Sequence, residues 1–118
     1  MFEYNAKVLK VVDGDTIDAW VDLGFDTWKK VRIRMHGINA PESRTRDKEE
    51  KKRGLAAKAR LIEILNEVDN EFILVSHGVG KFGRCLGDIR IQLNNTQKSV
   101  NLQLIKEGHG TEYFGGKR

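Results

Sequence analysis

The sequence predicts a mainly β protein of the α+β class: a five-stranded barrel, one helix between the third and fourth strands, and a short C-terminal helix. Three observations predict it. Several runs alternate apolar and polar residues, glycine-containing turn signals separate these runs, and one stretch after residue 54 repeats apolar residues at helical spacing. At 118 residues and 13.5 kDa the chain can bury one modest core, so we expect a single domain over residues 1–118.

The first three strands follow one another as a meander. Residues 7–12 form a β-branched run, and Asp13-Gly14 is a strong turn signal before a second run from Thr16 to Leu23. A third run extends from Thr27 to Gly37. Its alternation places Arg32, Arg34 and His36 together on the side that faces away from the core.

A highly charged segment, residues 43–53, contains almost nothing that could enter a core, so we expect a mobile surface loop there. Two interpretations of this loop remain open: a solvated charge run, or a lid that contacts a substrate. From Gly54 onward the pattern becomes that of an amphipathic helix. Its apolar face is formed by Ala57, Leu61, Ile64, Leu65 and Val68.

The remaining part of the chain predicts two more strands and a short helix. The strands are expected over residues 71–75 and 88–93, joined by the glycine-rich residues 76–80. Ser99 can cap a helix that runs through Glu107. Five strands with a helix between the third and the fourth is the element order of an OB-type barrel.

Composition narrows the classes of function only mildly. The 21 Lys and Arg residues against 17 Asp and Glu residues give a net charge of +4, a weak indication of a phosphate-bearing partner. A lone cysteine, Cys85, excludes an internal disulfide. No apolar run approaches the ~18 residues of a membrane span, and residues 1–7 lack a secretory pattern, so we expect a cytoplasmic protein unless a leader was removed.

Residues that could take part in catalysis or ligand binding lie at the predicted strand ends and turns. They are Asp13, Asp15, Arg34, Asn39, Glu42, Lys81 and Arg84. Two carboxylates across a glycine turn, with an amide and an acid from another rim, form an oxygen-rich set suited to a hard cation such as Ca²⁺. The two arginines offer planar forks that match phosphate oxygens. An ordinary surface role is the alternative for each residue taken alone.

Five motifs in the right order resemble the staphylococcal nuclease (thermonuclease-like) family over roughly residues 7–114. The motifs are Val12-Asp13-Gly14-Asp15-Thr16, Arg34 to Pro41-Glu42, Gly54 with its helix, Lys81-Phe82-Gly83-Arg84, and Val100-Asn101 through Leu104-Ile105 to Gly108. The resemblance implies an OB-fold barrel and a Ca²⁺-dependent nuclease that hydrolyses DNA and RNA with little sequence preference.

The resemblance also implies a metal site. Asp15 would be a direct ligand, Asn39 would take the second side-chain position, and Ala40 would supply its backbone carbonyl. Asp13 would support these ligands as a nearby acid. The family usually has an aspartate at the position of Asn39. With one negative charge fewer, we expect weaker calcium binding than in a typical member.

The resemblance assigns the chemistry to three further residues. Glu42 would orient or deprotonate the attacking water, and Arg34 and Arg84 would grip the scissile phosphate. Contacts to the nucleotide would come from Lys81, Phe82 and Tyr113, by charge or by ring stacking. We expect nucleic acid as the substrate and a monomeric protein.

Two other classes of function remain open. One is a non-catalytic OB-type module that binds nucleic acid through a weakened metal site. The other is a protein-interaction domain. No histidine pairs closely with a cysteine or another histidine in the sequence, so we expect no structural zinc site. We interpret Trp20 and Trp28 as packing residues rather than base-stacking platforms.

Overall fold

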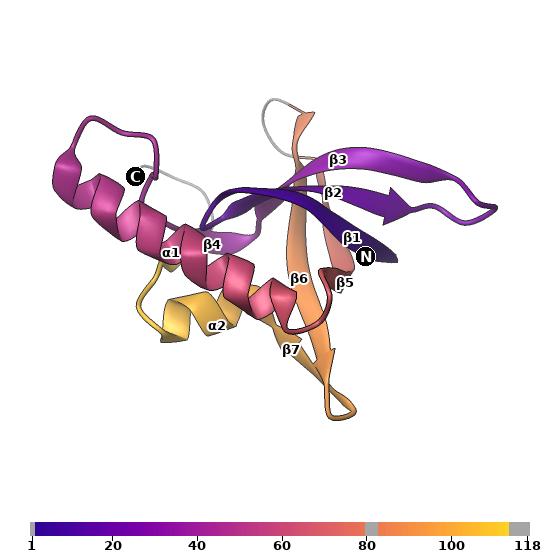
Figure 1. Ribbon diagram of the computed structural model, residues 1–118. Helices are drawn as coiled ribbons and strands as arrows, with labels where there is room; N and C mark the ends of the chain where they lie inside the picture. Colours follow the sequence, from indigo (N-terminus) through magenta and orange to yellow (C-terminus); the bar gives the residue numbers. More distant parts are fainter. Residues whose placement is uncertain (1, 80–82, 114–118) are drawn as a thin grey trace.

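A closed five-stranded barrel forms the body of the computed structural model, which describes residues 2–79 and 83–113 (Figure 1). Hydrogen-bonded neighbours follow the order β3-β2-β1-β5-β6, and β3 also pairs with β6, which closes the sheet on itself. The barrel strands are β1 (Phe2–Asp13), β2 (Thr16–Asp22), β3 (Trp28–Met35), β5 (Glu71–Val79) and β6 (Cys85–Leu93). This architecture confirms the predicted OB-type fold of mixed α+β class.

Among the residues that the structure describes, two helices and three short strands complete the fold. Helix α1 (Lys48–Asn66) follows the third barrel strand and crosses in front of the barrel, and α2 (Val100–Lys106) lies below it in Figure 1. Strand β7 (Thr96–Ser99) extends the sheet beside β6. Strands β4 (Gly37–Asn39) and β8 (Thr111–Tyr113) pair with each other and form a separate two-stranded sheet.

The barrel interior is filled by the alternating apolar residues of β2 and β3 together with the apolar stripe of α1. Ile17, Ala19, Ile33, Met35, Leu61 and Leu65 are all fully buried. Closure brings β3 and β6 together in parallel, with Arg34 opposite Leu86 and Met35 opposite Gly87. A Cβ at Gly87 would collide with the end of the buried Leu74 side chain on β5, so Leu74 would have to shift to admit a larger residue there.

The helix begins earlier than the sequence predicts, and residues 48–53 are helical rather than part of a loop. The Asp47 side chain caps this helix by accepting hydrogen bonds from the backbone nitrogens of Glu49 (3.0 Å) and Glu50 (3.2 Å). The acidic residues in the first turn also complement the helix dipole. A helical turn beyond the core needs no apolar face, so the hydrophobic pattern could not reveal it.

Short and terminal strands account for the other differences. Strand β1 begins at Phe2 rather than at residue 7, because residues 2–7 pair antiparallel with residues 71–76 of β5. Strand β5 continues to Val79, through part of the predicted glycine-rich connection. The short strands β4, β7 and β8 were not predicted at all. Each depends on partners whose pairing a local pattern does not encode.

An ion pair joins the two helices and predicts an acid-sensitive contribution to stability. Arg60 Nε lies 2.6 Å and Nη2 3.0 Å from the two carboxylate oxygens of Glu107. The Arg60 guanidinium, helped by Gln103, lowers the pKa of Glu107 from 4.5 to about 2. A depressed pKa stabilises the fold above pH 4.5, and this contribution is lost as the pH falls from 4.5 toward 2.

We therefore expect the melting temperature of the wild type to fall more steeply below pH 4.5 than that of Glu107→Gln. Thermal unfolding followed by circular dichroism between pH 7 and pH 2 measures this difference. Parallel curves for the two proteins would show that the pair contributes no pH-dependent stability.

Within the described part of the chain, neither helix combines the length and the apolar character needed to cross a membrane.

Candidate functional site

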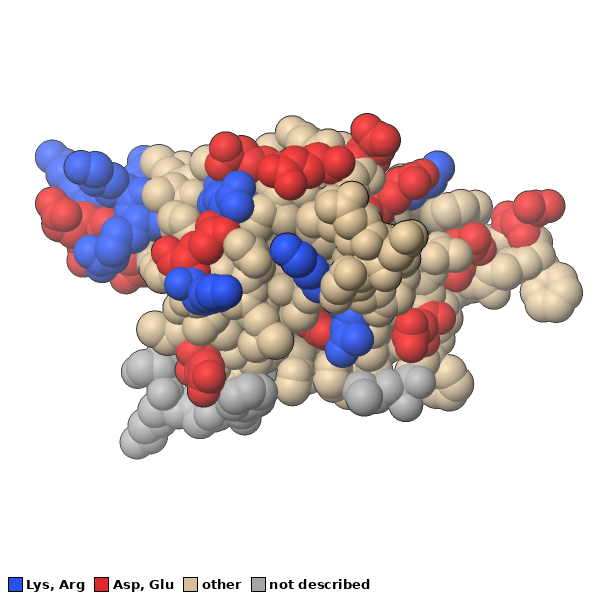
Figure 2. All heavy atoms as spheres, turned by 90° about the horizontal axis from the view of Figure 1, so that it is seen from below, with Lys and Arg blue, Asp and Glu red and all other residues tan. Residues whose placement is uncertain are grey.

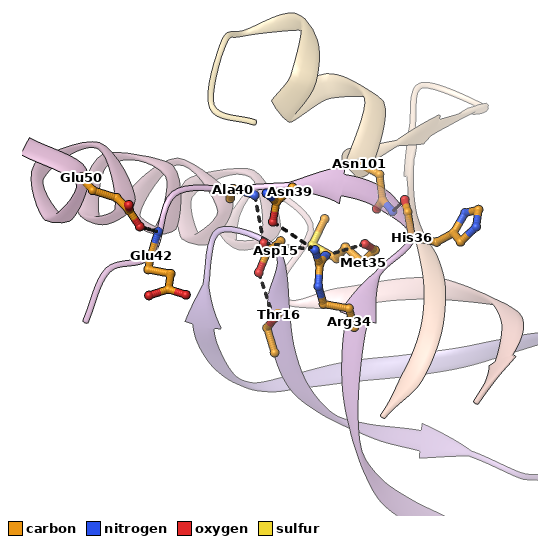
Figure 3. A network of polar contacts seen from close by, with 10 residues as sticks. All are labelled: Asp15, Thr16, Arg34, Met35, His36, Asn39, Ala40, Glu42, Glu50 and Asn101. Atoms are coloured by element: carbon orange, nitrogen blue, oxygen red, sulfur yellow. Dashed lines mark hydrogen bonds and ion pairs between the residues drawn. The ribbon is translucent and has the colours of Figure 1, made fainter. Parts of the chain in front are cut away.

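Asp15 is the centre of a polar cluster at one rim of the barrel (Figure 3). It lies just before β2, and only 7% of its surface is exposed. One carboxylate oxygen accepts a hydrogen bond from the Thr16 hydroxyl at 2.9 Å, and the other accepts one from the backbone nitrogen of Ala40 at 2.9 Å. The Asp15 carbonyl also accepts from the Met35 nitrogen. These contacts fix the orientation of a nearly buried carboxylate.

Arg34 approaches Asp15 from the adjacent strand β3. Its Nη2 lies 3.5 Å from the Asp15 carboxylate and 3.4 Å from the Asn39 amide oxygen, while Nη1 donates to the Met35 carbonyl at 2.8 Å. Only 14% of the side chain is exposed. The guanidinium is therefore held at a defined place on the rim, and the predicted meeting of Arg34, Asp15 and Asn39 is present in the structure.

Two short strands bring Asn39 and Tyr113 into the cluster. In the β4–β8 pairing, Asn39 lies opposite Thr111 and Gly37 opposite Tyr113. The Arg34 guanidinium carbon lies 5.9 Å from the centre of the Tyr113 ring, a cation–π contact. An otherwise distant C-terminal segment thus contributes an aromatic ring to the site.

Asp13 and Glu42 lie on the part of the rim nearest α1. The Asp13 carboxylate accepts hydrogen bonds from the hydroxyl and the backbone nitrogen of Ser43, which is 2% exposed. Glu42 is exposed, and its backbone nitrogen donates to the Glu50 carboxylate at 3.2 Å (Figure 3). The backbone that carries Glu42 is thus fixed from both sides.

Two glycines allow α1 to approach this rim closely. A Cβ on Gly54 would collide with the Glu42 carbonyl group and lie 2.7 Å from the Ser43 nitrogen. A Cβ on Gly14, in the turn between Asp13 and Asp15, would lie 2.7 Å from the Ala57 Cβ. Gly54 therefore packs directly on the Glu42 backbone, and the Gly14 turn packs on the small Ala57 side chain, which positions the acidic rim relative to α1.

The other predicted residues are placed less closely. Arg84 is half-buried and immediately precedes Cys85, the first residue of β6, which pairs with Ile33 of β3. It therefore lies at the start of the strand beside the one that carries Arg34. Lys81 and Phe82 lie outside the described residues. Sequence reasoning missed Thr16, Ser43, Glu50 and Asn101 as supporting residues, since their roles depend on contacts between distant segments.

Asn101 shows what kind of signal was available. It is 2% exposed, its amide nitrogen donates to the carbonyls of His36 (2.7 Å) and Gly87 (3.2 Å), and its oxygen accepts from the Ile89 nitrogen (3.1 Å). It thereby ties the end of β3 to β6. A polar residue among the apolar positions of a short helix could have indicated such a buried hydrogen-bonding role.

His36 does not share the site with Arg34, in contrast to the alternation of the sequence. Strand β3 ends at Met35, and the His36 ring turns away and stacks on His77 of β5, with centroids 4.2 Å apart. Burial, followed by the proximity of His77, lowers the pKa of His36. Among residues 2–79 and 83–113, no three His, Cys, Asp or Glu side chains form a group that could hold a metal.

A groove of about 660 Å³ lies beside Glu42, between the first turns of α1 and the segment that leads into β8. Asn39, Ala40, Glu42, Glu50, Arg53 and His109 are among its lining residues. The end of the molecule where α1 begins carries basic side chains interleaved with acidic ones (Figure 2). The groove leaves this part of the rim open to solvent. The charged side chains at this end of the molecule are of both signs.

The fold and the site define an OB-type barrel domain with a carboxylate–arginine cluster on one rim. The staphylococcal nuclease homologue family matches residues 32–117 of the chain, which include Arg34, Asn39, Glu42 and Arg84. The chain therefore belongs to the staphylococcal nuclease homologue family.

Curated relatives include nucleases and proteins with other names. The chain is 28% identical to protein ParB of Escherichia coli over 98% of its own length and 61% of that protein. It is 30% identical to endonuclease YhcR of Bacillus subtilis over 95% of its length, which is 9% of that protein. It is 28% identical to a micrococcal nuclease of Shigella flexneri over 94% of its length and 59% of that protein. The chain thus spans about three fifths or less of these relatives.

Proposed function

We propose that the chain is a Ca²⁺-dependent nuclease that hydrolyses phosphodiester bonds of DNA or RNA with little sequence preference. The observation that carries the proposal is the position of the Arg34 guanidinium beside the Asp15 carboxylate and the Asn39 amide. Membership of the nuclease family and two relatives with nuclease names support it. A planar cation held next to oxygen ligands can bind a phosphate that also contacts a metal.

The donors at the rim fit a hard cation such as Ca²⁺. A carboxylate on Asp15, an amide oxygen on Asn39 and the backbone carbonyl of Ala40 are all oxygen ligands, and Asp15 is held by Thr16 with little exposure to solvent. Asp13 is engaged by Ser43, so its role would be to support the turn. The bound cation would polarise the phosphate and neutralise charge that develops on it.

In the proposed reaction, each of these residues would have a separate role. Arg34 and Arg84 would bind the non-bridging phosphate oxygens, and Glu42 would accept a proton from the attacking water. The water oxygen would bond to phosphorus as the bond to the leaving oxygen breaks. The leaving oxygen would take up a proton from solvent, which leaves a phosphate monoester and a free hydroxyl. Tyr113, with Lys81 and Phe82, would contact the nucleotide. Because phosphate contacts carry no base information, cleavage would have little sequence preference.

A non-catalytic nucleic-acid-binding module is the second candidate, and Asn39 favours it. The amide leaves a single carboxylate, Asp15, among the three proposed ligands, and the Arg34 cation lies 3.5 Å from that carboxylate. Calcium affinity falls when the number of charged ligands is reduced. A site that no longer retains calcium could still bind a phosphate backbone.

Cleavage of labelled single-stranded DNA across a calcium titration into the high millimolar range separates the two candidates. Excess chelator and the Arg84→Ala protein, prepared in the same way, exclude a contaminating nuclease. The proposal expects cleavage that requires calcium and is lost in both controls. Intact DNA at every calcium concentration, bound by the protein, would replace the nuclease with the binding module.

Asn39→Asp is expected to lower the calcium concentration needed for half-maximal cleavage. The new carboxylate adds a negative charge to the ligand set, and calcium affinity depends on ligand charge. The shift should be about tenfold, corresponding to ~1.4 kcal/mol of binding free energy. Calcium titrations of the two proteins with one DNA substrate measure it, and an unchanged or higher requirement would reject position 39 as a ligand.

A further inference from the structure

The outer side of the first three strands, away from the polar cluster, carries basic and aromatic side chains, with Asp18 and Asp22 between them. We define the distal face as Lys7, Lys10, Trp20, Trp28 and Lys30. Antiparallel pairing places Lys7 opposite Trp20 and Trp20 opposite Lys30, and Lys10 opposite Asp18. These positions alternate with the buried Ile17, Ala19 and Val21 of β2, so they share the face turned away from the core.

The two tryptophans are exposed, in contrast to the packing role that the sequence analysis assigned them. Each has 42% of its surface exposed. Lys7 Nζ lies 5.7 Å from the centre of the Trp28 ring and 3.8 Å from the Glu71 carboxylate. A hollow of about 280 Å³ beside the Trp28 ring is lined by Asn5, Ala6, Lys7, Trp28, Glu71 and Phe72. A planar base has both an aromatic surface and polar side chains to contact there.

The distal face is continuous with the candidate site. Along β3, Trp28, Lys30, Arg32 and Arg34 occupy alternate positions and therefore point to the same side, over a span of roughly 20 Å. Between them, Asp18 is neutralised by Arg32, whose Nε and Nη2 lie 2.8 and 3.1 Å from its carboxylate oxygens. The lysines of the distal face thus lie near a carboxylate that is already paired.

We propose that the distal face binds the single-stranded part of a nucleic acid that extends from the scissile phosphate, with bases stacked on Trp20 and Trp28 and phosphates near Lys10 and Lys30. This inference rests on the proposed function, because it takes the Arg34 cluster as the place of cleavage. Stacking on exposed aromatic rings within a basic surface is the usual way of binding single strands without sequence preference. Duplex DNA keeps its bases stacked on one another, so the proposal commits to single strands.

Intrinsic fluorescence provides a direct test, because the chain contains two tryptophans and both lie on the distal face. The titration uses oligothymidylate of about 12 nucleotides, within the ~4–16-nucleotide range of OB-fold sites, and excess chelator to prevent cleavage. The proposal expects saturable quenching of tryptophan emission. A duplex of the same length should quench much less.

Variants locate the binding surface independently of the fluorescence. With a labelled oligonucleotide followed by anisotropy, Trp28→Ala should weaken binding about tenfold, and Trp28→Phe, which keeps a ring, should retain most of it. Lys30→Gln should weaken binding and reduce its dependence on salt concentration by about one counterion. The matched control is Leu102→Ala, since Leu102 is 65% exposed on α2 and should leave binding unchanged.

A dinucleotide substrate separates this proposal from the proposed function, since it is too short to span from Arg34 to Trp28. Trp28→Ala should cleave the dinucleotide like the wild type but require more of a long single strand for half-maximal rate. Oligonucleotide quenching without any cleavage would reject the nuclease and retain the binding surface. Absence of quenching, equal quenching by duplex, or wild-type binding by Trp28→Ala would each overturn the distal face as a single-strand site.

Discussion

Arg34→Ala is expected to reduce the cleavage rate by ~10²–10³, the loss found when one preorganised donor to a developing negative charge is removed. The guanidinium is almost buried and bonds to the Met35 carbonyl, so its position is set before any substrate arrives. The change also leaves the Asp15 carboxylate, which is 7% exposed, without its neighbouring cation. Some loss of stability should therefore accompany the loss of rate.

Arg34→Lys separates the shape of the cation from its charge. Lysine keeps the charge but has no planar fork, so it cannot contact Met35, Asn39 and Asp15 at once. We expect it to recover stability better than rate. Cleavage rates at saturating calcium, together with melting temperatures, measure both quantities.

A matched control lies between the two helices. Arg60 also forms a bidentate ion pair with a carboxylate, that of Glu107. Arg60→Ala should lower the melting temperature and leave the cleavage rate unchanged. If Arg34→Ala cleaves at the wild-type rate, the phosphate is bound elsewhere and the proposed arrangement of the site is wrong.

Local sequence patterns were sufficient to predict the barrel strands, because side chains at every second position of a strand lie on the same face. The alternation in residues 16–35 correctly predicts β2 and β3, and the spacing of Ala57, Leu61, Ile64 and Leu65 predicts the buried side of α1. The same alternation, with the motifs, places Asp15 just before β2 and Arg34 on the neighbouring strand β3. These two residues meet because the hairpin register sets Thr16 opposite Arg34.

The support of the site could not be predicted in this way. Ser43 contacts Asp13 across 30 positions of the chain, and Gly54 packs on the Glu42 backbone, neither of which a periodic pattern encodes. Trp28 is 42% exposed at the first position of β3, which its hydrophobic character does not predict. The surface turns of α1 formed because Asp47 caps them, although their composition resembles that of a loop.

Gly54→Ala is expected to impair both stability and cleavage, although helix propensity alone predicts the opposite. In an exposed helix, alanine is favoured over glycine by ~1 kcal/mol. Here the added Cβ would collide with the Glu42 carbonyl and lie 2.7 Å from the Ser43 nitrogen, backbone atoms that cannot rotate away. Either α1 or the rim must move, and displacement of a catalytic group by 1 Å can cost ~10² in rate.

Ala56→Gly is the control for Gly54→Ala, because Ala56 is exposed on the same helix. It should lower stability by the ~1 kcal/mol of helix propensity and leave cleavage unchanged. Because the two substitutions exchange glycine and alanine in opposite directions in the same helix, their comparison separates the effect of helix propensity from that of the contact between Gly54 and the Glu42 backbone. If Gly54→Ala instead raised the melting temperature and left the cleavage rate unchanged, the backbone of the rim would be able to shift without loss of function. In that case packing against α1 would not determine the position of Glu42. A loss of rate larger than the loss of stability explains would show that close packing of this helix holds the proposed base in place.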